Sequence, residues 1–182
     1  HPLKYPDDVV VERTKLGGVA AAWVDTPESA GSTRVLLHVH GGAFVSTGVD
    51  HYIPYAARLS RPFASRVVVF GYRLAPEHRY PAALDDTLAV YRALLDGGTP
   101  PDRIAIGGDS CGGGIGVALL LRLREEGAPL PAADQTTAGR SAAGTTKRSS
   151  CPLAATHRTC ATGSRRSRRH RLPGTSGRAC LS

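Results

Sequence analysis

Short apolar runs alternate with longer amphipathic segments along the first part of the chain. The runs are rich in β-branched residues and occupy residues 34–40, 66–73 and 103–108. Runs of this kind are typical of parallel strands that helices cover on both faces. Ahead of them, residues 9–14 and 19–24 predict an antiparallel hairpin with its turn at 16–18.

The segments between the apolar runs carry helical patterns. Residues 81–96 open with Pro81 and end before Gly97, and these residue types commonly mark the two ends of a helix. Residues 52–60 and 111–126 are further helix candidates. Strands that alternate with helices predict an α/β fold with right-handed crossovers between parallel strands.

This pattern stops close to residue 133. All ten aromatic residues lie before residue 92, and no Val, Ile, Phe, Tyr, Trp or Met follows residue 133. A segment with so few apolar residues cannot bury enough surface to offset the entropy that it would lose on folding. We therefore predict a partial α/β domain in residues 1–133 and a basic, disordered tail in residues 134–182.

Charge separates the same two regions. The net charge is +8, yet residues 1–133 carry 13 basic and 14 acidic side chains. Residues 134–182 carry ten basic side chains and one acidic. A basic tail would attract nucleic acid through its phosphates, but without interleaved aromatic residues we expect no specific nucleic-acid partner.

Other sequence features narrow the class of protein. No apolar run is long enough to cross a membrane, and the chain starts without the apolar core of a signal peptide, so we expect no membrane span and a cytoplasmic location. The four cysteines lack the spacing of a compact zinc site, so we expect no metal and no cofactor. The chain contains no Met, and we expect a fragment or a processed product.

Ser110 is a candidate nucleophile. It lies in Gly-Asp-Ser-Cys-Gly at residues 108–112, directly after an apolar run and directly before a helix candidate. A sharp turn from strand to helix exposes the serine hydroxyl, and only small neighbours tolerate its backbone. The start of the helix directs N–H groups and positive dipole at the attacked carbonyl. The alternative is a purely structural glycine turn.

A second glycine-rich segment, His-Gly-Gly-Ala-Phe at residues 40–44, follows the first apolar run. Backbone N–H groups that point at one spot stabilise the oxyanion of acyl transfer, and small residues let the substrate approach them. Alone, the segment is better explained as an ordinary turn. With a serine elbow about seventy residues later, it favours an oxyanion loop.

Three spaced motifs resemble those of the hormone-sensitive-lipase-like esterases, which belong to the α/β-hydrolase fold. They are HGGAF at 40–44, YRLAPE at 72–77 and GGDSCGG at 107–113. The resemblance covers about residues 9–133. It implies an α/β-hydrolase-type sheet, mostly parallel and flanked by helices, that is incomplete on its C-terminal side.

The same resemblance implies roles for individual residues. By position in the motifs, Ser110 would be the nucleophile. The N–H groups of Gly42, Ala43 and Cys111 would form the oxyanion hole, and Gly41 would shape its loop. Ala43 stands where the family usually has a third glycine, and Cys111 stands where alanine is commoner, although only its N–H enters the mechanism.

The catalytic acid and base are not identified. In α/β-hydrolases they follow the serine in the order acid, then histidine. His157 and His170 follow Ser110, but they lie among arginines in a segment without a packing signal, and a general base must be held within reach of its proton. We therefore expect both partners to be missing from this chain, whose tail resembles the out-of-frame translation of a GC-rich gene.

Together these expectations predict a carboxylic-ester or lactone hydrolase that works through a serine acyl-enzyme on a small-molecule substrate. The chain would be an incomplete copy, and its own activity is left open. One alternative is a non-catalytic, small-molecule-binding member of the same fold, and another is a non-functional frameshift product. No motif specifies the acyl preference or the oligomeric state.

Overall fold

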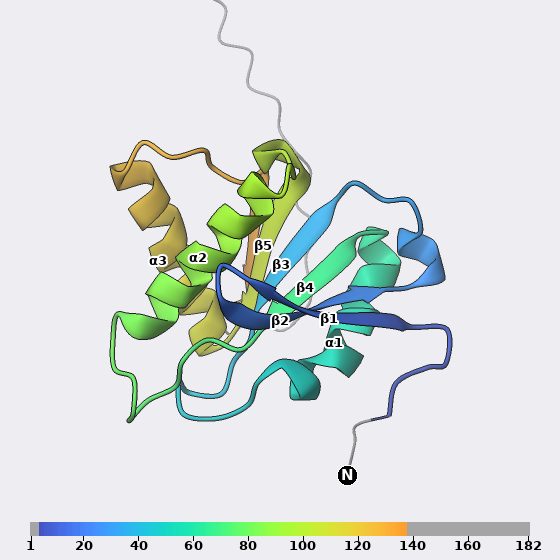
Figure 1. Ribbon diagram of the computed structural model, residues 1–182, viewed down its shortest axis with the longest axis horizontal. Helices are drawn as coiled ribbons and strands as arrows, with labels where there is room; N and C mark the ends of the chain where they lie inside the picture. Colours follow the sequence, from blue (N-terminus) through green and yellow to red (C-terminus); the bar gives the residue numbers. More distant parts are fainter. Residues whose placement is uncertain (1–3, 138–182) are drawn as a thin grey trace, which may run out of the picture. The chain divides into compact units, whose positions relative to one another are not determined.

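A six-stranded sheet runs through the computed structural model, which describes residues 4–137 (Figure 1). Its strands are β1 (Val10–Leu16), β2 (Val19–Asp25), β3 (Val35–Val39), β4 (Arg66–Phe70), β5 (Ile104–Asp109) and β6 (Ala133–Thr137). Their spatial order is β1-β2-β4-β3-β5-β6. Three α-helices complete the domain: α1 (Val49–Phe63), α2 (Ala82–Asp96) and α3 (Cys111–Glu125). Two short 3-10 turns, at Pro27–Ser29 and Pro101–Arg103, precede β3 and β5.

The centre of the sheet is parallel. β3 pairs with β4 on one side and with β5 on the other, and Leu37 lies opposite both Val68 and Ile106. β1 and β2 form the predicted antiparallel hairpin around Gly17 and Gly18, and β2 continues antiparallel to β4. The structure thus confirms an α/β fold with a mostly parallel sheet.

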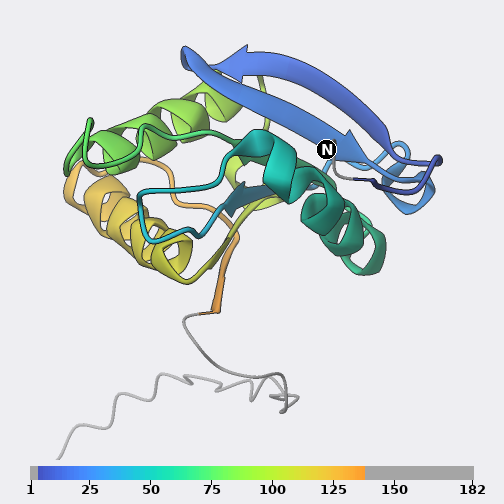
Figure 2. The same cartoon turned by 90° about the horizontal axis from the view of Figure 1, so that it is seen from below.

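Helices cover both faces of this sheet. Figures 1 and 2 show α1 on one face and the pair α2 and α3 on the other. Successive residues of β4 serve the two faces in turn, because Val67 and Val69 pack with Ile53 of α1 whereas Val68 and Phe70 join the cluster beneath α2 and α3. This double burial explains why the central strands are apolar at nearly every position.

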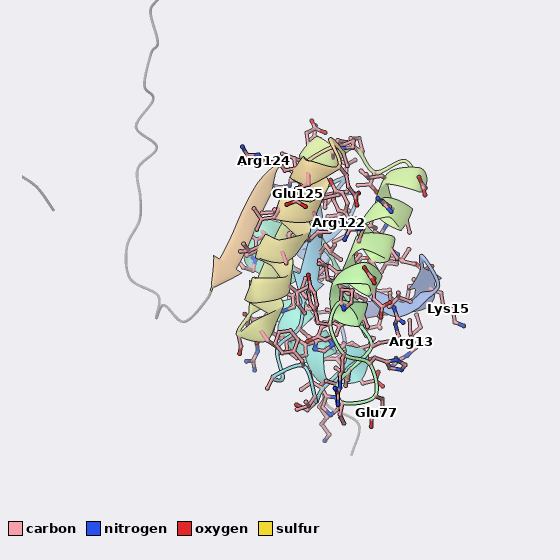
Figure 3. All side chains as sticks on the ribbon, turned by 90° about the vertical axis from the view of Figure 1, so that its left-hand side faces the viewer. Arg13, Lys15, Glu77, Arg122, Arg124 and Glu125 are labelled. Atoms are coloured by element: carbon pink, nitrogen blue, oxygen red, sulfur yellow. The ribbon has the colours of Figure 1, made fainter. Side chains whose placement is uncertain are left out.

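The outer surface of α3 is polar at its C-terminal end. Arg122, Arg124 and Glu125 are exposed there (Figure 3), and Arg122 pairs with Glu126 one turn away, Nε to Oε1, at 2.6 Å. Leu119 and Leu123 of the same helix are fully buried. None of the helices within residues 4–137 is long and apolar enough to cross a lipid bilayer.

Strand ends shift from the prediction by up to three residues, and α1 and β6 depart from it further. The helix expected over residues 52–60 extends over Val49–Phe63, with Pro54 and Pro62 inside it. Pro54 misled the prediction because proline commonly stands in a first helical turn. Here it lies one turn later, where it lacks the N–H that would bond back to Asp50.

β6 continues the sheet past the boundary predicted at residue 133. Its backbone pairs in parallel with β5, from Ala105 opposite Ala133 to Asp109 opposite Thr137. Its sequence carries no strand pattern. It can still form a strand, because the free edge of a sheet offers main-chain hydrogen bonds that do not depend on apolar side chains. The rest of the predicted tail, from residue 138 on, lies outside the described residues.

Candidate active site

Ser110 stands at the turn between β5 and α3. Its backbone angles are φ 51° and ψ −124°, a sparsely populated conformation for a residue with a side chain, and the residue is exposed. Small neighbours make the turn possible. A Cβ on Gly108 would lie 2.6 Å from the carbonyl carbon of Gly112, and a Cβ on Gly112 would lie 2.6 Å from His40 O. The predicted serine elbow therefore has the expected tight backbone.

The glycine-rich loop follows β3 and adopts left-handed backbone conformations. The φ angles of Gly42, Ala43 and Phe44 are 114°, 54° and 66°. A Cβ on Gly42 would collide with Ser46 O, so glycine is required at that position. None of the hydrogen bonds found within residues 4–137 uses the backbone N–H of Gly42 or Ala43. At the elbow, the first N–H groups of α3 likewise have no acceptor inside the helix.

His40 holds this loop from the inside. Its ring is buried and stacks on Tyr72 with ring centroids 4.0 Å apart. Nδ1 lies 2.7 Å from Gly41 O and 2.9 Å from Thr47 Oγ1. A carbonyl oxygen only accepts, so Nδ1 carries the proton. Burial lowers the pKa of His40, because the imidazolium would lose its hydration, and the residue is a neutral hydrogen-bonding group.

The segment after β4 is tied to both the loop and the helical layer. The Tyr72 hydroxyl donates to His40 O at 2.9 Å and lies 3.7 Å from Cys111 Sγ, and burial raises its pKa. The next residue, Arg73, is bound by Asp86 of α2, with Nη2 2.8 Å from Oδ1 and the backbone N–H 2.8 Å from Oδ2. The YRLAPE motif thus joins the site to α2.

Asp109 links the elbow to the glycine-rich loop, and sequence reasoning missed this role. Its Oδ1 lies 3.3 Å from Nε2 of the buried His38, and its Oδ2 accepts a 2.9 Å hydrogen bond from the Tyr52 hydroxyl. Tyr52 in turn accepts a 2.9 Å hydrogen bond from Gly41 N–H. The hydrogen bond from His38, followed by that from Tyr52, lowers the pKa of Asp109. Its place beside Ser110 was the only signal in the sequence.

No base contacts the serine among the described residues. Within residues 4–137, none of the hydrogen bonds joins the Ser110 hydroxyl to a histidine. His157 and His170 lie outside those residues. In the same part of the chain, no three His, Cys, Asp or Glu side chains gather where they could hold a metal ion.

A cavity of about 590 Å³ opens next to the elbow and the loop. Ala43 and Phe44 of the loop line it, together with Ile115 of α3 and Leu84 of α2. Arg79 stands at the same cavity. Most of its lining is apolar, so it suits a hydrocarbon group rather than a polar one.

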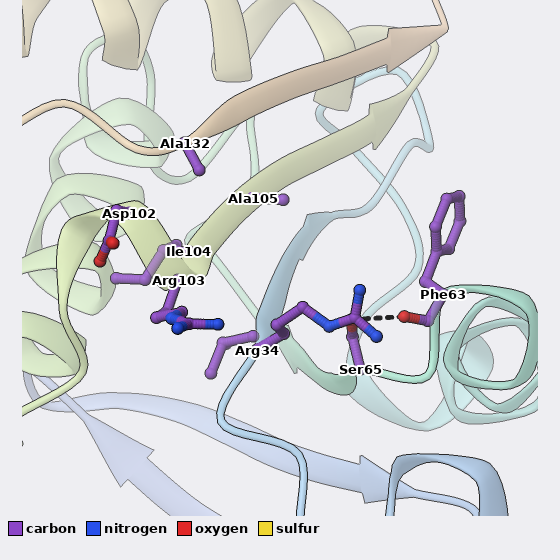
Figure 4. Close-up of a pocket in the computed structure, with 9 residues that line it drawn as sticks. Arg34, Phe63, Ser65, Asp102, Arg103, Ile104, Ala105 and Ala132 are labelled. Atoms are coloured by element: carbon purple, nitrogen blue, oxygen red, sulfur yellow. Dashed lines mark hydrogen bonds between the residues drawn. The ribbon is translucent and has the colours of Figure 1, made fainter.

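A smaller cavity, of about 200 Å³, lies at the opposite end of the strands (Figure 4). Arg34, Ser65 and Ile104 line it where β3, β4 and β5 begin, whereas Ser110 follows the end of β5. The two cavities are therefore at different ends of the sheet, and the larger one adjoins the glycine-rich loop and the second turn of α3.

A serine elbow after one parallel strand and a glycine-rich loop after its neighbour define an α/β-hydrolase-type protein. Comparison with known proteins agrees with that class. The family described as alpha/beta hydrolase fold matches residues 36–167, and the chain belongs to it. Residues 138–167 of the match lie beyond the part of the chain that the structure describes.

Individual relatives that the chain resembles are named as ester-hydrolysing enzymes. It is 39% identical over 128 residues to an acetyl-hydrolase of Streptomyces hygroscopicus, a match that covers 70% of this chain and 41% of that protein. It is 40% identical over 94 residues to a carboxylesterase/phospholipase of Mycobacterium tuberculosis, covering 52% of this chain and 25% of that protein. The chain thus spans less than half the length of these relatives.

Solved structures point to the same group. An esterase from the bacterial hormone-sensitive lipase family has a TM-score of 0.71 and 42% identity, over 74% of this chain and 45% of its own. EstE5, soaked with p-nitrophenyl butyrate, has a TM-score of 0.71 and 38% identity, over 74% and 45% of the two chains. The resemblance to hormone-sensitive-lipase-like esterases, first inferred from three motifs, is confirmed.

Proposed function

We propose that Ser110 is the nucleophile of a carboxylic-ester hydrolase. The observation that carries this proposal is the close contact between the serine elbow and the glycine-rich loop. A Cβ on Gly112 would lie 2.6 Å from His40 O, and a Cβ on Gly41 would lie 3.1 Å from Asp109 O. This contact supports a position of the N–H groups of Gly42 and Ala43 beside the start of α3.

In the proposed reaction, Ser110 Oγ attacks the ester carbonyl and a base takes the hydroxyl proton. The carbonyl oxygen becomes an oxyanion, which accepts hydrogen bonds from the N–H groups of Gly42, Ala43 and Cys111. The alcohol leaves with that proton, and water then hydrolyses the acyl-enzyme and restores the serine. No histidine among residues 4–137 is bonded to Ser110, and no base is identified among those residues.

The apolar cavity beside the elbow would receive a hydrocarbon part of the ester. Its volume, about 590 Å³, is that of an ordinary small-molecule pocket. Ala43 and Ile115 connect it to the loop and to the first turns of α3. We therefore propose a small ester or lactone as the substrate, with no metal or cofactor in the reaction.

A mass measurement tests the nucleophile without requiring turnover. The full chain is incubated with a fluorophosphonate, which bonds covalently to activated serines. We expect one adduct per chain, located at Ser110 and formed slowly because no histidine among residues 4–137 is bonded to the serine, and no adduct in Ser110→Ala. Ser32→Ala is a matched control, because Ser32 bonds to Ala64 O and lies outside the elbow and the loop. An adduct that survives Ser110→Ala, or no adduct on the unchanged protein, would contradict the proposal.

A non-catalytic binding protein is the second candidate. It is favoured by the lack of a histidine partner for Ser110 within residues 4–137. It predicts saturable binding of p-nitrophenyl butyrate near Ala43 and Ile115, with no covalent adduct. Calorimetric titration of the chain with that ester, run beside the mass measurement, separates the two functions.

A further inference from the structure

The hydroxyl of Tyr52 connects the two halves of the candidate site. Tyr52 lies in the first turn of α1. Its oxygen accepts the N–H of Gly41 at 2.9 Å and donates its proton to Asp109 Oδ2 at 2.9 Å. Gly41 begins the glycine-rich loop, and Asp109 immediately precedes Ser110. One side chain from a third element therefore bonds to both.

The direction of these two hydrogen bonds is fixed by chemistry. An amide N–H can only donate, and an ionised carboxylate can only accept. The phenol must keep its proton to make both bonds. Burial and the neighbouring Asp109 carboxylate raise the pKa of Tyr52 to about 12, although Gly41 N–H opposes that rise. The bridge is thus intact throughout the neutral range.

The space between the loop and the elbow is also filled. A Cβ at Gly41 would collide with Asp109 Oδ2. On its other oxygen, Asp109 lies 3.3 Å from Nε2 of the buried His38, so the carboxylate itself cannot turn freely. The glycine-rich loop therefore packs at Gly41 against the Asp109 carboxylate, whose orientation is restrained by His38.

We propose that Tyr52 is a positioning residue that sets the place of the N–H groups of Gly42 and Ala43 relative to Ser110. This role rests on the proposed function, because it matters for catalysis only if those groups receive the oxyanion. Such donors act only within a narrow range of distance and angle. A loop freed from Tyr52 would still fold against Asp109, but its N–H groups would sample a wider range of positions.

The test uses two single-atom changes on the same helix. Tyr52→Phe removes the hydroxyl and keeps the ring, which stacks on His38 with centroids 5.5 Å apart. Tyr55→Phe is the matched control. Tyr55 lies one turn along α1 and contacts the same His38 ring, at 5.1 Å, and its hydroxyl makes none of the hydrogen bonds found within residues 4–137.

Two readouts separate the local bond from its effect on the site. The first is amide hydrogen exchange at Gly41 by nuclear magnetic resonance, which needs no activity. We expect it to speed up about tenfold in Tyr52→Phe, since one hydrogen bond is lost. The second is fluorophosphonate labelling of Ser110, resolved into binding of the probe and its maximal rate. We expect the maximal rate to fall about tenfold with unchanged probe binding. Tyr55→Phe should change neither readout.

Each other outcome also decides the matter. Unchanged exchange at Gly41, or faster exchange with an unchanged maximal labelling rate, would overturn the positioning role. If the unchanged protein is not labelled, the proposed function fails. In that case the positioning role is tested by the amide chemical shifts of Gly42 and Ala43 in nuclear magnetic resonance spectra. If these shifts are the same in Tyr52→Phe as in the unchanged protein, the positioning role is overturned. If that variant does not fold, the lack of a nuclear Overhauser contact between Tyr52 and Gly41 N–H in the unchanged chain would overturn the proposal.

Discussion

Two glycines in the first turns of α3 should respond in opposite ways to the same added methyl group. Gly112 and Gly114 are both helical. A Cβ on Gly112 would collide with Val39 O and lie 2.6 Å from His40 O, whereas a Cβ on Gly114 meets nothing within 4 Å. Alanine substitution at the two positions therefore compares a blocked site with an open one in a single helix.

The sizes of the two effects follow from these surroundings. At Gly112 the obstructing atoms are backbone atoms of β3 and the residue after it, so no side chain can rotate away. Forcing a methyl group into such a site costs about 1–3 kcal/mol. At Gly114 alanine restricts the unfolded chain and favours the helix, which stabilises by about 0.5–1 kcal/mol. The free energies of unfolding of the two variants should differ by about 1.5–4 kcal/mol.

Urea denaturation followed by circular dichroism measures this difference. With a denaturant dependence of about 1–3 kcal/mol per molar urea, the two midpoints should lie roughly 0.5 M or more apart, with the unchanged protein between them. If Gly112→Ala were as stable as the unchanged protein, the close approach of α3 to the end of β3 would be refuted. A loss of stability in Gly114→Ala would refute the open space assigned to that position.

Three further changes test other parts of the fold. Because burial lowers the pKa of His40, the folded protein binds a proton at this residue less readily than the unfolded chain does. The free energy of unfolding should therefore fall as the pH drops below about 6.5. Urea midpoints measured at several pH values should show a smaller fall in His40→Gln. Tyr91→Phe removes a 2.8 Å hydrogen bond to Pro129 O and should cost about 1 kcal/mol in urea denaturation. Asp86→Asn weakens the pairing with the half-exposed Arg73, so we expect a loss of about 1 kcal/mol, smaller at high salt, by the same method.

The central sheet and the helices could be predicted from local pattern alone. Strands covered on both faces must be apolar at nearly every position, so β3, β4 and β5 are evident in the sequence. Proline and glycine marked the ends of α2, which begins at Ala82 and ends before Gly97 as expected. These signals depend on residues that are close together in the chain, so they can be recognised without knowledge of the fold.

The two errors in the fold share a different cause. α1 begins at Val49, and the few residues between Val49 and Pro54 are too short a segment to show a helical repeat of apolar positions. β6 has no apolar pattern, and its pairing with β5 depends on a sheet edge that exists only in the folded protein. In both cases tertiary structure supplies what the local sequence lacks.

In the candidate site, too, some residues could be predicted from the local sequence and others are brought together only by the fold. Ser110 and the glycine-rich loop were predicted because backbone turns demand particular small residues, and such demands are visible in one segment. In the link from Gly41 through Tyr52 to Asp109, the first two residues are 11 positions apart and the last two are 57 apart, and His38 adds a contact with Asp109 across 71 positions. Tyr, His and Asp at those distances have no shared pattern. Their grouping arises because β3 and β5 are neighbours in a parallel sheet and because Tyr52, in the first turn of α1, reaches the loop that follows β3. The proposed nucleophile and oxyanion loop can thus be predicted from the sequence, whereas the residues proposed to position them can be identified only in the fold.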